Sequence, residues 1–154
     1  MTKLEQIETK LRDNSVNVNN FAIDDKIKAM SHIVRGRKTV ALNRGILCSK
    51  ADETSVLAEE LGHFETGALY VIDSTYNTCI ARSNRLKYEA TARHWAYKKY
   101  CTPDEIETAF KQEGIYGDYA VAEYCQVTVE FLHKAIEYHR SKGVVFSFDN
   151  DDCA

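Results

Sequence analysis

The sequence predicts a single α+β domain that is mostly helical and contains a small β-sheet. Apolar residues recur at spacings of three and four over most of the 154 residues, as they do on amphipathic helices. A short stretch between residues 33 and 42 is instead rich in β-branched side chains, which favour strands. The one proline and seven glycines lie mostly between the periodic segments. We therefore expect helices joined by short connections.

The first third of the chain is expected to contain a helix followed by a pair of strands. Residues 3–13 place their leucine and isoleucine side chains on one helical face, which predicts an amphipathic helix. Residues 21–30 are expected to form a second short helix. The β-rich segments 33–34 and 39–42 flank Gly36 and predict two strands at the edge of a small sheet.

The remainder of the chain predicts five helices, several of which begin at serine or threonine. These hydroxyl groups accept hydrogen bonds from the first N–H groups of a helix. The expected helices run from Ser49 to Glu65, from Ser83 to Tyr100, from Thr102 to Gln112, from Tyr119 to Cys125 and from Thr128 to Arg140. The domain is expected to span residues 1–145. Residues 146–154 are acidic, and we expect them to be a disordered tail.

Composition and charge argue against several classes of protein. The hydrophobic fraction of 44% and the charged fraction of 28% are typical of globular proteins. A net charge of −3 and a pI near 6.0 provide no overall attraction to nucleic acid or acidic lipid. The N-terminus lacks the apolar core of a signal peptide, so we expect a cytoplasmic protein without membrane contact. The five cysteines are widely spaced and form no C-x-x-C pair, which argues against a disulfide framework and a cysteine zinc site.

The segment E-E-L-G-H, residues 59–63, differs by one residue from the H-E-x-x-H signature of zinc peptidases. On a helix, Glu59 and His63 lie one turn apart on the same side, as two ligands of one metal ion must. A catalytic zinc takes three protein ligands, and Glu89 in the next long helix is the best candidate for the third. Glu60 would then act as the general base.

The five-residue motif is weak when taken alone, because adjacent glutamates are common on solvated helical faces. An ordinary surface helix is therefore the competing interpretation. If the site exists, its two glutamates suit hard cations better than two histidines would. Zinc is the favoured ion, and manganese is the alternative.

Three blocks of the sequence together resemble the ImmA/IrrE family of metallopeptidases, and most closely its branch from prophages and mobile elements. The blocks are VLAEELGHFETG (56–67), YEATARHWA (88–96) and YAVAEYCQVTVEFLHKAIEYH (119–139), within a similarity that covers residues 20–145. The resemblance implies a reduced zincin-like fold, with a small sheet beside the metal-binding helix and a following helix that donates a glutamate. It also implies a partner, because members typically cleave, or relieve repression by, a helix-turn-helix repressor.

The resemblance also implies a role for each candidate site residue. The metal ligands fall on Glu59, His63 and Glu89, and the catalytic glutamate falls on Glu60. Glu59 stands where the family has its first histidine, which is the one departure from the motif. The implied function is a zinc-dependent metallo-endopeptidase that cleaves a regulatory repressor. The alternative is a non-catalytic zincin-like interaction module that binds such a repressor without cleaving it.

Residues 119–139 can also be interpreted as a helix-turn-helix unit that binds DNA directly. A recognition helix needs cations and amide side chains that face the DNA. Residues 117–140 instead contain four acidic residues and two basic ones. We therefore expect a packed helical hairpin and no direct contact with nucleic acid.

A short basic cluster, Arg35, Arg37 and Lys38, lies beside the expected edge strand. Charged residues at a sheet edge discourage aggregation, and this is the favoured interpretation. In the alternative interpretation the edge accepts an extended substrate segment by strand addition, and the basic residues select an acidic or phosphate-bound partner.

Overall fold

A computed structural model describes residues 1–22, 25–69 and 79–149 of the chain. Within these residues the protein is α+β and mostly helical, as the sequence predicted. In chain order the elements are α1 (Lys3–Asp13), β1 (Val16–Asn20), β2 (Ala29–Val34), β3 (Arg37–Leu42), the short 3-10 helix η1 (Arg44–Ile46), α2 (Lys50–Thr66), α3 (Cys79–Tyr100), α4 (Pro103–Lys111), α5 (Gly117–Tyr124) and α6 (Val129–Ser141). No helix in the described ranges is both long and apolar enough to cross a membrane.

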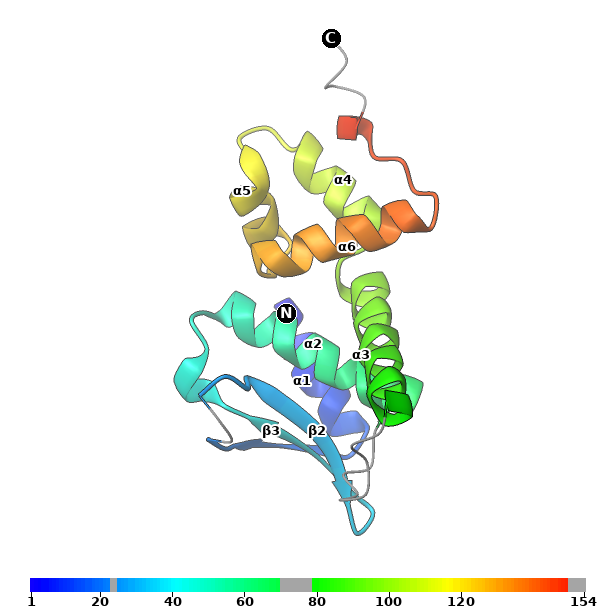
Figure 1. Cartoon of the computed structure of the whole chain (residues 1–154). Helices are drawn as coiled ribbons and strands as arrows, with labels where there is room; N and C mark the ends of the chain where they lie inside the picture. The colour runs from blue at the N-terminus through cyan, green and yellow to red at the C-terminus, as the bar shows by residue number, and fades with distance from the viewer. Residues whose placement is uncertain (23–24, 70–78, 150–154) are drawn as a thin grey trace.

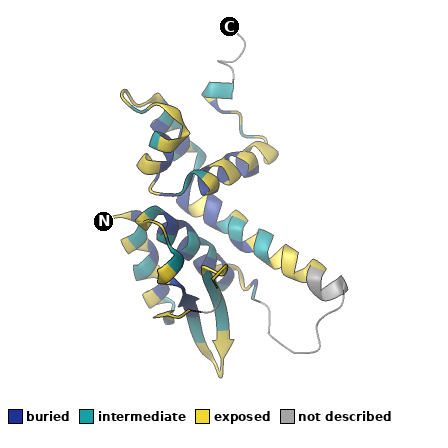
Figure 2. Ribbon diagram, turned by 60° about the vertical axis from the view of Figure 1, so that its left-hand side comes forward, coloured by how far each residue is buried: buried dark blue, intermediate teal, exposed yellow. Residues whose placement is uncertain are grey.

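The helix α3 connects two halves of the molecule (Figure 1). One half contains the sheet together with α1 and α2, and the other contains α4, α5 and α6. Both halves contribute to one continuous core, which includes Leu11, Leu42, Leu61, Ile106 and Leu132. Buried residues accordingly lie on the inner faces of the helices on both sides of the junction (Figure 2). The two halves therefore bury apolar surface jointly, which favours folding as one unit.

The three strands are arranged in the order β1-β3-β2, so that β2 forms one edge of the sheet. The strand β1 runs parallel to β3, and β2 runs antiparallel to it. Arg35 and Gly36 join β2 to β3 with φ angles of 50° and 76°. Two consecutive positive φ values are characteristic of the two-residue turn that matches the twist of a hairpin.

The turn also determines which backbone groups of β2 point away from β3. Hydrogen-bonded and non-hydrogen-bonded pairs alternate along an antiparallel ladder. The carbonyl of Lys28 accepts a hydrogen bond from the N–H of Asn43, 2.8 Å away, so the bonded pairs involve every second residue from Lys28. The N–H and C=O groups of Ala29, Ser31 and Ile33 consequently point away from β3, toward the edge where the described residues add no further strand.

Two sequence predictions in the first third were wrong. Residues 21–30 were expected to be helical, but Ala29 and Met30 belong to β2, where they pair with Leu42 and Ala41. This tertiary pairing overrides the local helical pattern. No strand was predicted at β1, because three of its five residues are asparagine, which is uncommon in strands. Its first valine is buried against the core, as the period of two requires.

Most predicted helix ends are confirmed by the caps. Ser49 precedes α2 and its hydroxyl accepts a hydrogen bond from the N–H of Asp52, while Gly67 ends the helix with a φ of 68°. Thr102 and Thr128 cap α4 and α6 in the same way. Ser83 was wrong as a cap, because α3 already begins at Cys79.

The predicted disordered tail was placed too early in the chain. Phe146 is fully buried, and its ring stacks on that of Phe148 with 5.0 Å between centroids. Asp149 forms an ion pair with Arg140 of α6. Aromatic burial therefore holds residues 146–149 against the helices, and the rest of the predicted tail, 150–154, lies outside the described residues.

A buried lysine joins the beginning of the chain to the half that contains α4 and α5. The ammonium group of Lys3 donates to the carbonyl oxygens of Tyr100 at 2.6 Å and Cys125 at 2.5 Å, and to the carboxylate of Glu105 at 2.8 Å. These acceptors belong to the C-terminal ends of α3 and α5 and to the first turn of α4. All three protons of the ammonium group thus have acceptors, which offsets the cost of burying its charge.

Replacing Lys3 by Ala should lower the free energy of unfolding by about 2–4 kcal/mol, because the buried acceptors lose their charged donor. Chemical denaturation followed by circular dichroism measures this loss. Lys10→Ala on the same helix is the matched control, since Lys10 is half-exposed and lies 3.8 Å from Glu65. The control should change stability by about 0.5 kcal/mol or less. Equal effects of the two substitutions would contradict the structural role of Lys3.

Candidate metal and peptidase site

The candidate site depends on a close approach between α2 and α3. A Cβ atom added to Gly62 would lie 2.4 Å from the carbonyl oxygen of Ala92, a distance that no real contact tolerates. Only glycine therefore allows the two backbones to come this close. The next residue, His63, is thereby placed opposite Glu89, which lies one turn before Ala92 on α3.

The imidazole ring of His63 is buried and held in one orientation. Its Nδ1 atom lies 2.6 Å from the carbonyl oxygen of Ala68, which can only accept a hydrogen bond. Nδ1 must therefore carry the proton, and the neutral ring has its lone pair on Nε2. Nε2 lies 3.7 Å from Oε2 of Glu89. Metal-ligating histidines commonly donate a hydrogen bond from the N–H of their other ring nitrogen to a carbonyl oxygen in this way.

The surroundings of His63 favour a positive charge at the ring. Burial acts to lower the pKa of His63, but the hydrogen bonds with Glu89 and with the carbonyl of Ala68 outweigh it. The negative charge of Glu60 acts in the same direction, and the pKa is raised overall. The carboxylates of Glu60 and Glu89 would also stabilise a bound metal cation, because their negative charges attract it as they attract a protonated imidazole ring.

Glu60 projects from the face of α2 that packs against β2. Its carboxylate is almost entirely buried and accepts a short hydrogen bond from the hydroxyl group of Ser31. Burial raises the pKa of Glu60 to about 7, although Ser31 and His63 oppose this rise. A carboxylate in this position can accept or donate a proton near neutral pH.

Glu59 forms an ion pair with an arginine on α3. Its Oε2 atom accepts a hydrogen bond from Nε of Arg93 at 3.2 Å. The Nη2 atom of Arg93 also lies 3.6 Å from Oε2 of Glu89. Arg93 is therefore shared between two of the predicted ligands.

The structure thus brings together some of the predicted site residues and separates one. His63 and Glu89 lie side by side, and Glu60 lies on the neighbouring face of α2 beside the sheet. Glu59 is occupied by Arg93, and the described residues include no group of three His, Cys, Asp or Glu side chains that could hold a metal ion. The role of Glu59 as a third ligand remains a prediction.

Two residues of the site were not identified from the sequence. Arg93 follows Glu89 by four residues, a spacing that places both on one helical face and could have indicated their ion pair. Ser31 could not have been found in this way, since its contact with Glu60 depends on how β2 packs against α2. The strand predicted at residues 33–34 also began after Ser31.

Comparisons with protein-family models, with curated proteins and with solved structures find no match to this chain.

Replacing Gly62 by Ala should lower the free energy of unfolding by about 1–3 kcal/mol, because α2 and α3 must move apart to accommodate the methyl group. Gly45→Ala is the control, since its nearest contact would be a side-chain atom of Asn43 at an ordinary 3.4 Å. Thermal unfolding of both variants measures the difference. A Gly62→Ala protein as stable as the unmodified chain would show that the close approach is not required.

Proposed function

We propose that the protein is a metal-dependent endopeptidase with a zincin-like fold, in which His63 and Glu89 hold the ion and Glu60 is the general base. The observation that supports this proposal most directly is the orientation of His63. The bond from Nδ1 to Ala68 leaves the lone pair of Nε2 directed toward the side of the ring where Glu89 lies. An imidazole nitrogen beside a carboxylate is a donor pair that suits zinc, and manganese is the alternative.

The residues present fit such an ion in part. The distance of 3.7 Å between Nε2 of His63 and Oε2 of Glu89 is close to the separation of about 3.3 Å that two tetrahedral zinc ligands adopt. A divalent ion bound there supplies a Lewis acid that polarises a carbonyl group and acidifies water. Glu59 can contribute a third ligand only after it exchanges Arg93 for the ion.

The position of Glu60 supports its proposed role as the general base. Its carboxylate lies beside Ser31, whose backbone N–H and C=O groups point to the open edge of β2. A peptide added to this edge would pass next to the carboxylate. Glu60 could then accept a proton from the attacking water and deliver it to the leaving nitrogen. This arrangement favours an extended polypeptide as the substrate.

The resemblance to ImmA/IrrE proteins supports a helix-turn-helix repressor as the partner and the cytoplasm as the location. Direct binding of DNA through α6 is disfavoured by its packing. The backbone N–H of Thr128, at the start of α6, donates to the hydroxyl of Ser55 on α2 at 3.0 Å. The N-terminal end of a recognition helix would instead have to be open to the major groove.

The second candidate function is a non-catalytic interaction module that binds such a repressor. The ion pair between Glu59 and Arg93 favours it, because a carboxylate neutralised by arginine is a poor metal ligand. The two functions differ in metal content, which can be measured directly.

Protein purified without chelator should contain about one zinc or manganese ion per chain, and His63→Ala should remove it. His133→Ala is the matched control, since His133 lies on the exposed surface of α6 beside Asp118. Elemental analysis by mass spectrometry measures all three proteins. Lack of metal in the unmodified protein, even after zinc is added, would favour the interaction module.

Replacing Glu60 by Gln should retain the metal ion but slow cleavage of the repressor by roughly a hundredfold to ten-thousandfold, because the amide cannot accept the proton. Glu53→Gln on the same helix is the control and should cleave normally. Gel electrophoresis with mass spectrometry of the fragments measures the rates. Undiminished cleavage by Glu60→Gln would remove Glu60 from the mechanism.

A further inference from the structure

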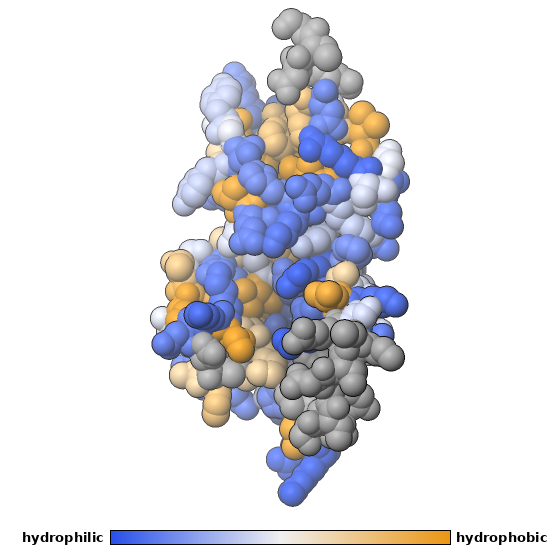
Figure 3. All heavy atoms as spheres, in the orientation of Figure 1, coloured by the Kyte–Doolittle hydropathy of each residue, from blue (hydrophilic) through white to orange (hydrophobic). Residues whose placement is uncertain are grey.

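A second feature lies beside the candidate site, at the junction of the two halves. It is a pocket of about 310 Å³ between α2, α3, the first turns of α6 and the residue that precedes β2. Its charged lining comprises three basic residues, Lys28, Arg93 and Lys134, and three acidic residues, Asp52, Glu59 and Glu130. Figure 3 shows hydrophilic residues across the middle of the molecule, where α6 lies in Figure 1.

Each basic residue of the pocket forms an ion pair, but the two charges of each pair are unequally exposed. The side chains of Lys28, Arg93 and Lys134 are 46%, 43% and 48% exposed. Asp52 and Glu59, by contrast, are only 6% and 29% exposed, and Glu130 alone is open to solvent. A ligand would therefore meet three partly exposed basic groups together with one exposed carboxylate, that of Glu130, which is 76% exposed.

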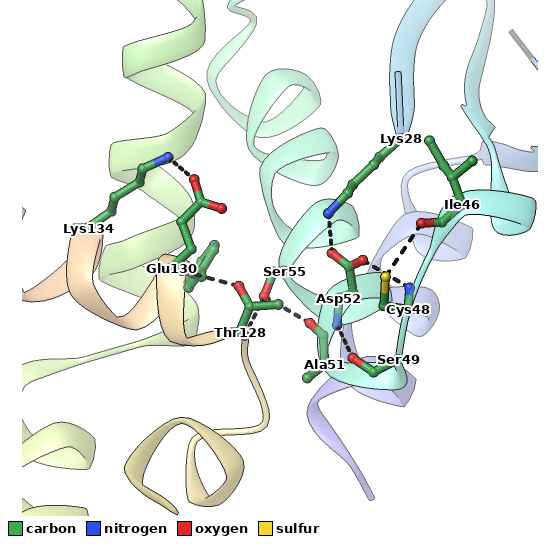
Figure 4. Close-up of polar contacts among 11 residues, drawn as sticks. Lys28, Ile46, Cys48, Ser49, Ala51, Asp52, Ser55, Thr128, Glu130 and Lys134 are labelled. Carbon is green, nitrogen blue, oxygen red and sulfur yellow. Dashed lines mark hydrogen bonds and ion pairs between the residues drawn. The ribbon is translucent and has the colours of Figure 1, made fainter. Parts of the chain in front are cut away.

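The lysines approach the pocket from opposite sides. Figure 4 shows Lys28 paired with Asp52 of α2 on one side and Lys134 paired with Glu130 of α6 on the other. The hydrogen bond from the N–H of Thr128 to Ser55 connects α6 to α2 between them. The N-terminal end of α6 thus borders the pocket, and the N–H of its Thr128 already has Ser55 as acceptor.

The Lys134–Glu130 pair can open to admit a ligand. Both residues lie on the surface of α6 at a spacing of four, an arrangement that contributes little to stability. A carboxylate from another molecule can replace Glu130 at the ammonium group with little loss. Lys28 can similarly share its ammonium group, because Asp52 also accepts a hydrogen bond from the N–H of Cys48 at 3.1 Å.

The pocket lies at the beginning of β2. Lys28 directly precedes this strand, and Ser31 beside Glu60 lies three residues further on, a distance of about 10 Å along an extended chain. Arg93 lies between the pocket and the candidate metal site, since it contacts both Glu59 in the pocket and Glu89 beside His63. A peptide paired with β2 would therefore bring one of its side chains to the pocket.

We propose that this pocket binds an acidic side chain of an extended polypeptide that lies along β2. That this polypeptide is the substrate rests on the function proposed above, and its acidic residue would then lie about three residues from the cleaved bond. A peptide fits better than a nucleic acid. Asp52, Glu59 and Glu130 interrupt the positive surface, so it accepts single carboxylates rather than a continuous row of phosphates.

The test is a binding measurement on the full chain in buffer with chelator, so that neither metal nor cleavage contributes. The probe is a short fluorescein-labelled peptide of alanine and serine that contains Asp-Glu-Asp, and its neutral counterpart contains Asn-Gln-Asn. Fluorescence anisotropy should show at least roughly tenfold tighter binding of the acidic peptide at low salt, with loss of this preference at high salt.

Lys28→Gln and Lys134→Gln should each weaken binding of the acidic peptide by roughly threefold to tenfold. Lys111→Gln is the matched control, because Lys111 forms an equivalent surface pair with Glu107 on α4, and it should leave binding unchanged. Circular dichroism checks that every variant is folded. Equal binding of both peptides, an equal loss in Lys111→Gln, or tighter binding of single-stranded DNA would overturn the proposal.

The outcome is separable from that of the proposed peptidase function. Binding of the acidic peptide by a protein that holds no metal and cleaves nothing would support the pocket and contradict only the enzyme. Cleavage of a repressor at a bond without a nearby acidic residue, unaffected by Lys134→Gln, would contradict only the pocket.

Discussion

The close approach of α2 and α3 at Gly62 is the constraint on which the site depends. Because no side chain separates Gly62 from the carbonyl group of Ala92, residues one position later and one turn earlier can meet across the two helices. His63 and Glu89 face each other for this reason, and Glu59 reaches Arg93 across the same crossing. One glycine thus determines both the candidate ligand pair and the ion pair that competes with it.

Carboxylates outnumber cationic groups around this crossing. Three carboxylates, those of Glu59, Glu60 and Glu89, surround one imidazole and one guanidinium group. Arg93 neutralises part of this negative charge beside Glu59, whereas a divalent ion would neutralise it between His63 and Glu89. A divalent ion would therefore compete with Arg93 for Glu59, and this competition would distinguish the two proposed functions. The same arginine borders the pocket beside α6, so a ligand there would also affect this competition.

The junction between the two halves has a structural role and a proposed binding role. Lys3 holds the ends of α3 and α5 together with its three donor protons. Ser55 and Thr128 join α2 to α6 on another part of the junction. These bonds place α6 so that Lys134 faces Lys28 over the pocket (Figure 4). Packing of the C-terminal helices against the sheet-containing half therefore creates a surface that neither half has alone.

The sequence by itself determined the α+β class, most helix boundaries and the spacing of the E-E-L-G-H segment, because caps and periodicity act over a few residues. It did not determine β1, the start of β2 or the packing of Phe146, since each depends on contacts between distant segments. Tertiary structure alone decided that Glu59 pairs with Arg93 and that Ser31 binds Glu60. Helical spacing predicts which side chains share a face of one helix, but the residues that they contact on other elements depend on how the helices and strands pack.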